Sequence, residues 1–351
     1  MGLLKKAGMR SVFTIFLSFI ILALPSGAAN DSGDGSRTDR WAVVSLSSIY
    51  MRTLPDYESA LETQELMGSV VRIVGEKGYW REIVSEQPYR AWCTEKGLIE
   101  MSEKQIETYR SADKCIFTDL YGHVYERPSD KSATVCDLVG GDILRFMGKR
   151  GRWVRVMLPS GTEGWIKAAQ TRLHEGFRSI AKGEGDSGTV SEQEMECILD
   201  EAMKLKGVPY LWGGMTSKGV DCSGLVRISY LMNGILLPRN ASQQIFCGDE
   251  VEMTPDTAFW QEERRVMKEG RYSEEFIEEM NKRIRNLERG DLVFFGTPSE
   301  DGSRPRITHV GIYIGEGHII HSSHLVRINS LIPTDDDYYE NAHRLLAARR
   351  L

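Results

Sequence analysis

The chain has 351 residues, of which 41% are hydrophobic and 27% charged, and its formal net charge is −6. This composition is ordinary for a globular protein, and the length predicts two or three domains. Because proteins that bind nucleic acids usually present a basic face, the acidic balance argues against a nucleic-acid partner.

Residues 1–29 are predicted to be a secretory signal peptide that does not belong to the fold. Basic residues precede the apolar run Ser11–Leu24 and small residues follow it, so we expect cleavage after Ala29. The run is too short to span a bilayer comfortably, and an uncleaved N-terminal anchor is the alternative. We therefore expect an exported protein, in the periplasm or outside the cell, without stable membrane insertion after cleavage. Asn30–Arg40 is a polar lead-in.

The six cysteines are scattered and form no CxxC pair, so no metal site is expected. Export permits disulfides, but the spacing does not indicate which cysteines would pair. They are Cys93, Cys115, Cys136, Cys197, Cys222 and Cys247.

Residues 41–171 contain an internal repeat whose offset is constant at 73 residues. Short alternating runs and glycine turns predict the β-strands of a small barrel in each copy. The motifs resemble bacterial SH3-like domains of cell-wall proteins, which implies one such domain over residues 30–105 and a second over residues 106–175. The matched pairs are Pro55 and Pro128, Gly68 and Gly141, Gly75 and Gly148, Gly78 and Gly151, Trp80 and Trp153, and Trp92 and Trp165.

The two copies differ just before their closing tryptophan. Copy one has Tyr89 where copy two has Thr162. An aromatic hydroxyl at the rim of a barrel can serve packing, or Tyr89 can face a ligand, and both interpretations stay open at this point.

A linker over residues 176–190 precedes a third domain over residues 191–351. Ser191 and Glu194 form a capping box at the start of a helix. Asp221 is well placed as the N-cap of a second helix, which would put Cys222 in its first turn. Because a helix N-terminus favours the thiolate, we expect a lowered pKa for the thiol of Cys222. A buried structural cysteine is the alternative.

Two strands near the C-terminus carry histidines and are close enough in sequence to form a hairpin. His309 lies in the first strand and His321 in the second. Together with Cys222 they have the residue types of a thiol peptidase, in which the thiol attacks a carbonyl and His309 is the base. A second polar group, His321, would orient that base.

Five blocks of the third domain resemble the NlpC-type bacterial cell-wall peptidases, which are papain-like cysteine peptidases. The resemblance implies the catalytic residues Cys222, His309 and His321, and no metal or organic cofactor. It also implies contacts between substrate and Tyr210, Trp212, Arg239 and Ser242. The predicted fold class is multidomain: two small all-β SH3-like barrels, then an α+β papain-like cysteine peptidase domain. The blocks are 209–214, 221–225, 239–244, 290–295 and 309–315.

The combination of both domain types resembles the branch of γ-D-glutamyl-L-diamino-acid endopeptidases, also called dipeptidyl-peptidase VI. This resemblance implies hydrolysis of the γ-D-Glu–diamino-acid bond in L-Ala-γ-D-Glu-diaminopimelate, in cell-wall turnover or recycling. It further implies that Tyr89, Asp221 and Ser223 surround the free amine of L-Ala, together with an acidic residue of the first domain. The matching position holds Ala60, with Glu58 and Glu62 nearby.

Several alternatives stay open. The chain could cut intact peptidoglycan with its SH3-like domains docked on the wall, bind the wall without catalysis, or act as an acyltransferase or amidase. The sequence does not decide between diaminopimelate and Lys, and it leaves the oligomeric state open. Cys222 and His309 lie 87 residues apart, which is wide for this family. We interpret residues 251–287 as an insert of two surface helices that a short linker could replace, and a lid is the alternative.

Overall fold

The computed structural model describes residues 40–85, 89–180, 189–253, 272–299 and 305–351. The predicted signal peptide and its cleavage site lie outside these residues. Among the helices described, none is both long and apolar enough to cross a membrane. By their contacts, residues 39–351 form one unit.

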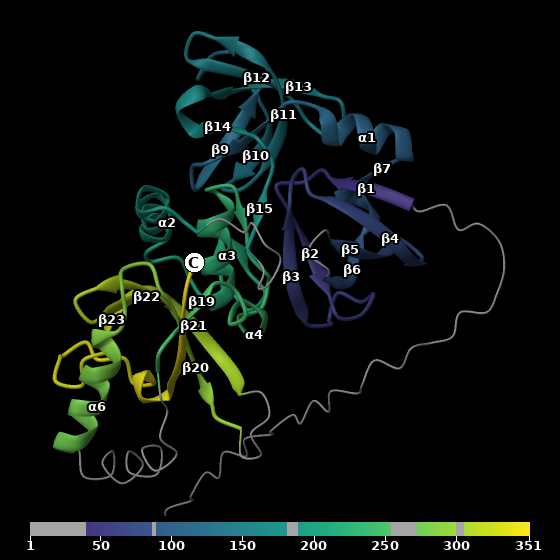
Figure 1. The fold of residues 1–351 in the computed structure, drawn as a ribbon. Helices are drawn as coiled ribbons and strands as arrows, with labels where there is room; N and C mark the ends of the chain where they lie inside the picture. The colour runs from purple at the N-terminus through teal and green to yellow at the C-terminus, as the bar shows by residue number, and fades with distance from the viewer. Residues whose placement is uncertain (1–39, 86–88, 181–188, 254–271, 300–304) are drawn as a thin grey trace, which may run out of the picture. The chain divides into compact units, whose positions relative to one another are not determined.

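The first repeat forms a seven-stranded sheet in the order β3-β2-β6-β5-β4-β1-β7 (Figure 1). Successive side chains along its strands point alternately to a buried and to an exposed face, and the core on the buried face includes Ala42, Met51 and Ile83. The 3-10 helix η1 (Glu95–Gly97) precedes the last strand. The strands are β1 (Arg40–Val44), β2 (Ser48–Arg52), β3 (Leu61–Leu66), β4 (Val70–Lys77), β5 (Trp80–Ser85), β6 (Arg90–Thr94) and β7 (Leu98–Met101).

The second repeat forms a sheet with the same strand order, β10-β9-β13-β12-β11-β8-β14. Even an irregularity recurs, since the register shifts between Ile73 and Gly75 in one copy and between Phe146 and Gly148 in the other. Trp80 and Trp153 are each 5% exposed, so this matched pair is buried, whereas Trp92 and Trp165 are partly buried. The elements are β8 (Lys114–Phe117), β9 (Tyr121–Tyr125), β10 (Thr134–Val139), β11 (Ile143–Arg150), β12 (Trp153–Met157), β13 (Glu163–Lys167), η2 (Ala168–Gln170) and β14 (Thr171–His174).

Helix α1 (Glu103–Ser111) connects the two sheets and begins with a capping box formed by Ser102 and Gln105. The buried carboxyl of Asp142 accepts backbone N–H bonds from Met67 at 3.1 Å and from Val139 at 2.9 Å, so one side chain joins both sheets. Burial raises the pKa of this carboxyl well above its usual range.

The C-terminal region is an α+β domain built on a six-stranded antiparallel sheet in the order β19-β24-β20-β21-β22-β23. The predicted hairpin is confirmed, because Gly311 on β21 pairs with His321 on β22. The strands are β19 (Asp249–Val251), β20 (Leu292–Thr297), β21 (Arg306–Gly315), β22 (His318–Ser323), β23 (Leu325–Ser330) and β24 (Leu345–Arg350), with η3 (Ala342–Arg344) before the last.

Helices pack on both faces of this sheet (Figure 1). One core cluster joins Leu292 and Phe294 to α2 (Glu192–Lys204) and α3 (Cys222–Leu231), and α4 (Ala241–Gln244) follows α3. The other joins Val293 and Phe295 to α6 (Glu274–Arg285). The predicted caps are confirmed at Ser191 for α2 and Asp221 for α3. Two short ladders complete the domain, β15 (Arg178–Ser179) with β18 (Ile235–Leu236) and β16 (Met215–Thr216) with β17 (Gly219–Val220).

The second helix predicted for residues 251–287 is confirmed as a helix that packs on the domain, and whether a short linker could replace the segment stays a prediction. This helix is α6, whose Phe276 and Met280 are 2% and 0% exposed within the core behind the sheet. The buried guanidinium of Arg283 also donates to the carbonyl of Leu345 at 2.8 Å. Deleting α6 would remove these contacts from the core behind the sheet. The first predicted helix falls within residues 254–271, outside the described residues.

Candidate active site

Cys222 is the first residue of α3 and is 9% exposed. The carboxylate of Asp221 caps the helix by accepting the N–H of Gly224 at 2.7 Å. The backbone N–H groups of Val310 and Ser223 donate toward the thiol sulfur, which places the thiol beside the strand residue that follows His309.

The expected fall in the pKa of the Cys222 thiol is wrong. Burial, followed by the charge of Asp221, raises this pKa to about 12, although the two backbone N–H groups and Arg239 act in the opposite direction. Burial outweighs the helix terminus because a thiolate loses its hydration at this position. Cys222 therefore rests as a thiol and needs a base when it attacks.

The two histidines of the hairpin are in contact. His309 Nε2 lies 2.8 Å from His321 Nδ1, and His321 Nε2 lies 3.0 Å from Asn329 Oδ1. Burial is the main cause that lowers the pKa of His309 to about 3 and that of His321 to about 4. Both imidazoles are therefore neutral at pH 7, and a neutral His309 can accept the thiol proton.

Two tyrosines border this pair and the thiol. Tyr339 is 3% exposed, and its ring meets the rings of His309 and His321 at centroid distances of 5.6 and 4.5 Å. Burial and the neighbouring Cys222 and Asp221 raise the pKa of Tyr210, so its hydroxyl keeps its proton beside the thiol. Tyr210 can therefore donate a hydrogen bond to a carbonyl that the thiol attacks.

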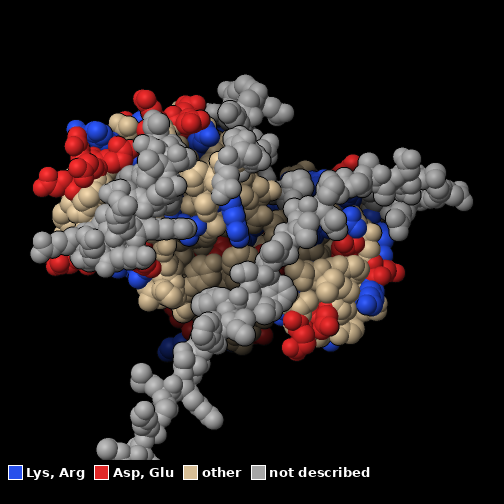
Figure 2. Space-filling view, turned by 90° about the horizontal axis from the view of Figure 1, so that it is seen from below, with Lys and Arg blue, Asp and Glu red and all other residues tan. Residues whose placement is uncertain are grey.

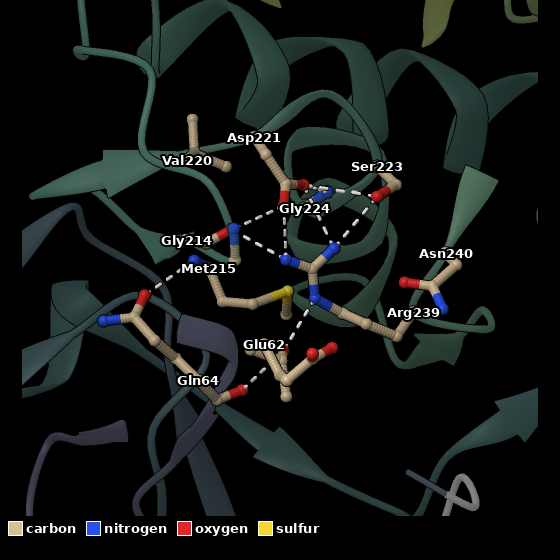
Figure 3. A network of polar contacts seen from close by, with 12 residues as sticks. Glu62, Gln64, Gly214, Met215, Val220, Asp221, Ser223, Gly224, Arg239 and Asn240 are labelled. Carbon is tan, nitrogen blue, oxygen red and sulfur yellow. Dashed lines mark hydrogen bonds and ion pairs between the residues drawn. The ribbon is translucent and has the colours of Figure 1, made fainter. Parts of the chain in front are cut away.

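Asp221 and Arg239 form a buried ion pair next to Cys222 (Figure 3). All five N–H bonds of the guanidinium are used: Arg239 donates to Asp221 at 2.6 and 3.0 Å and to Ser223 Oγ at 2.9 Å. Its remaining bonds go to the carbonyl of Gly214 and to Thr63 Oγ1, at 3.4 and 2.7 Å. Arg239 thus links the start of the nucleophile helix to β3 of the first sheet.

The same network fills the acceptor sites of Asp221. Its carboxylate also receives Ser223 Oγ and the N–H groups of Gly213 and Gly224. A carboxylate offers about four lone-pair sites, so Asp221 anchors the network, and a substrate ammonium could bind it only by replacing an internal donor.

The first sheet supplies further groups at the same place. Tyr89 donates to Glu62 Oε2 at 2.8 Å, and both line one hollow with Thr53, Arg90 and Gln243. Gln64 accepts the N–H of Met215 at 2.7 Å. Gly213 has a φ of +76°, and an added Cβ would lie 3.0 Å from the backbone of Glu62, so only glycine allows this approach.

Two predicted contact residues lie apart from these networks. Trp212 is 68% exposed, and Ser242 is an exposed residue in the single turn of α4. The structure joins His309 to His321 and places the thiol of Cys222 beside Val310, the neighbour of His309. Asp221, Ser223 and Arg239 form one network next to Cys222, Tyr210 lies near Cys222 and Asp221, and Tyr89 bonds Glu62. For Trp212 and Ser242 a substrate contact stays a prediction.

The sequence did not indicate Asn329 or Tyr339 and did not select Glu62 from its neighbours. Asn329 lies on the adjacent strand opposite Ile319, two residues from His321, so its contact with His321 becomes visible only with the register of β22 and β23. The alternation of β3 is a usable signal for Glu62, since it puts Glu62 and Gln64 on one face.

Among the described residues, His318, Asp335 and Asp337 form a group close enough to hold a cation, with ligand atoms within 4.8 Å of one another. These side chains are partly exposed, and we assign no metal to them.

All six cysteines lie in the described part of the chain and are free. On the face drawn in Figure 2, acidic and basic side chains are interspersed with uncharged surface.

Comparison with known proteins is consistent with this geometry. Residues 207–345 match the model of the NlpC/P60 family. A gamma-D-glutamyl-L-lysine dipeptidyl-peptidase of Bacillus cereus is 27% identical over 290 residues, which cover 80% of this chain and 72% of that protein. An enzyme with the same name from Bacillus subtilis is 24% identical over 84% of this chain and 82% of its own length.

A solved structure is similar over most of the chain. It is an NlpC/P60 family protein from Bacillus cereus, with a TM-score of 0.66 and 21% identity, covering 88% of this chain and 99% of that one. At this level of identity the likeness supports the fold, including the papain-like architecture of the C-terminal domain and the β-rich N-terminal sheets.

Proposed function

We propose that this chain, which contains an NlpC/P60 cysteine peptidase domain and is a cell-wall peptidase, hydrolyses the γ-D-Glu–diamino-acid bond of murein peptides with a free N-terminal L-Ala. Murein-derived peptides are therefore its substrates, and the diamino acid is diaminopimelate or Lys. The names of its relatives, which specify γ-D-glutamyl-L-lysine, support this class of bond.

The observation that carries the proposal is the pair Glu62 and Tyr89 beside the Arg239 network. An α-ammonium in a partly closed site needs anionic and hydroxyl acceptors to replace its water. Glu62 supplies the anion, because within the described part of the chain its carboxylate accepts a hydrogen bond from Tyr89 alone, whereas the carboxylate of Asp221 accepts five. A carboxylate of the first sheet therefore becomes the acidic partner of the amine.

The catalytic role follows from the neutral resting state of the site. Cys222 attacks the γ-carbonyl carbon of D-Glu while its proton moves to His309, and Tyr210 donates to the carbonyl oxygen. The proton then passes from His309 to the leaving amine of the diamino acid, the C–N bond breaks, and water hydrolyses the thioester.

We further propose that the two N-terminal sheets are SH3-like barrels in domains over residues 30–105 and 106–175. Their matched strand order and matched core tryptophans support this assignment. Export by cleavage after Ala29, to the periplasm or cell wall, completes the proposal and rests on the sequence pattern of residues 1–29.

The test is incubation with L-Ala-γ-D-Glu-diaminopimelate and with its Lys analogue, analysed by mass spectrometry. We expect the dipeptide L-Ala-D-Glu and the free diamino acid, and we expect iodoacetamide to stop their formation. Cleavage elsewhere in the peptide, or cleavage that resists the alkylating agent, would refute the proposal.

A further inference from the structure

Asn329 extends the histidine pair into a continuous chain of four polar groups. It lies on β23 and is 9% exposed. Its Nδ2 donates to the backbone carbonyl of Asp337 at 2.7 Å, and its Oδ1 lies 3.0 Å from His321 Nε2. His321 Nδ1 then lies 2.8 Å from His309 Nε2. Each link is within hydrogen-bond distance.

The carbonyl of Asp337 fixes the orientation of the amide. A carbonyl oxygen can only accept, so the Asn329 group that faces it must be the NH2. The amide oxygen of Asn329 therefore faces His321, and it too can only accept. His321 must carry its proton on Nε2, and since a neutral imidazole has one N–H, its Nδ1 is a bare acceptor.

We propose that Asn329 is a positioning residue of the peptidase, which acts through His321 to determine the nitrogen of His309 that is free to take the proton of Cys222. With His321 Nδ1 bare, His309 must donate from Nε2, and its Nδ1 keeps the lone pair. The reverse tautomer of His321 would donate from Nδ1 and push the proton of His309 onto Nδ1. A protonated Nδ1 cannot accept the thiol proton.

These tautomers account for the proton of Cys222 at each step of the reaction. When the sulfur of Cys222 bonds the carbonyl carbon, its proton moves to His309 Nδ1 and makes an imidazolium. The Nε2–H of His309 stays bonded to His321, and Asn329 holds His321 as the acceptor throughout. When the C–N bond breaks, the proton leaves Nδ1 for the amine, and the original tautomers return.

The groups around His309 and His321 explain why residue 329 is a neutral amide. The thiol of Cys222 approaches from α3, Tyr339 covers both rings, and the cation of Arg327 on β23 opposes protonation of either histidine. Glu340 has the opposite effect on His321. A neutral amide fixes the tautomer without a charge that would keep an imidazolium in the resting enzyme.

The direct test is nitrogen NMR of the protein labelled with 15N-histidine at pH 7, because bare and protonated imidazole nitrogens have well separated shifts. We expect His309 and His321 both to be neutral and protonated at Nε2, with signals assigned by their loss in His309→Gln and His321→Gln. Protonation of His321 at Nδ1 in the wild type would overturn the proposal, and this result needs no variant at Asn329.

Variants separate positioning from a merely structural role. We expect kcat of Asn329→Ala to fall about 10- to 100-fold, less than for loss of an orienting triad member, with KM changed less than about twofold. Its NMR spectrum should show the Nδ1–H tautomer of His321. The carboxylate of Asn329→Asp can still accept from His321, so this variant should keep the Nε2–H tautomer. Its negative charge favours the imidazolium, so the acidic limb of the plot of kcat against pH should move to higher pH.

Asn233→Ala is the matched control, because that amide also donates to a carbonyl, Ser229 O at 2.9 Å, and accepts from Arg172. It should lose comparable stability and keep its kcat. A kcat of Asn329→Ala within twofold of the wild type would contradict the proposal. So would a large fall in kcat with unchanged tautomers. The proposal concerns the cysteine peptidase chemistry alone, so any cleaved peptide can serve as substrate.

Discussion

Replacing Arg239 with alanine should destabilise the protein strongly, because its guanidinium is 5% exposed and uses all five N–H bonds. The change leaves the carboxylate of Asp221 buried without a counter-charge. Removal of one partner of a buried ion pair costs about 3–5 kcal/mol. At about 2–4 °C per kcal/mol for a domain of this size, the melting temperature should fall by about 6–20 °C.

The assay is calorimetry together with urea unfolding of the wild type, Arg239→Ala and the double variant Asp221→Asn/Arg239→Met. The double variant removes both charges and should recover much of the loss. Arg289→Ala is the control, since Arg289 pairs with Glu196 at 2.7 Å with both side chains about half exposed, and it should cost at most about 1 kcal/mol. A loss below about 1 kcal/mol for Arg239→Ala, or a double variant less stable than the single one, would refute the reasoning.

Three further predictions concern the thiol, the histidines and α6. Cys222→Ala should abolish turnover while the melting temperature stays within a few degrees of the wild type, and His321→Ala should lower kcat about 10²–10⁴-fold; near-normal activity of Cys222→Ala would mean another nucleophile. Burial lowers the pKa of His309 to about 3, so below pH 6.5 the folded state binds fewer protons than the unfolded state. The contribution of His309 to the free energy of unfolding is therefore fully present above pH 6.5 and should fall by about 2 kcal/mol at pH 5. Urea unfolding should show a shallower fall for His309→Gln, and equal slopes would contradict the assigned pKa. Met280→Ala should cost about 2–5 kcal/mol in the same assay, because Met280 is fully buried behind the sheet, and a cost near zero would support the interpretation of α6 as decoration.

Local signals predicted much of the fold. Capping patterns placed the starts of α2 and α3 at Ser191 and Asp221, and the constant offset of 73 residues anticipated two sheets with one strand order. The alternation around His309 and His321 predicted the hairpin that brings their rings together. These features depend on neighbouring residues, or on copies of one pattern, so they are readable from a single sequence.

The features that the sequence did not reveal depend on distant contacts. Arg239 reaches Thr63 across 176 positions, and nothing local to either residue indicates that bond. The pKa of Cys222 depends on how completely the folded chain buries the thiol, whereas the sequence showed only the helix terminus. The partnership of Asn329 with His321 depends on strand register. Amphipathic spacing identified α6 but did not show that its Phe276 and Met280 enter the core behind the sheet.

The recognition of a free substrate amine by Glu62 and Tyr89 is the central claim, and one ratio tests it most directly. That ratio compares kcat/KM for L-Ala-γ-D-Glu-diaminopimelate with kcat/KM for its N-acetylated form. We predict that the wild type strongly prefers the free peptide, and that Glu62→Gln and Tyr89→Phe each reduce this preference by about 10- to 150-fold, the value of a hydrogen bond to a charged group. Equal rates on both peptides in the wild type would contradict the claim and would favour an open cleft that accepts intact peptidoglycan.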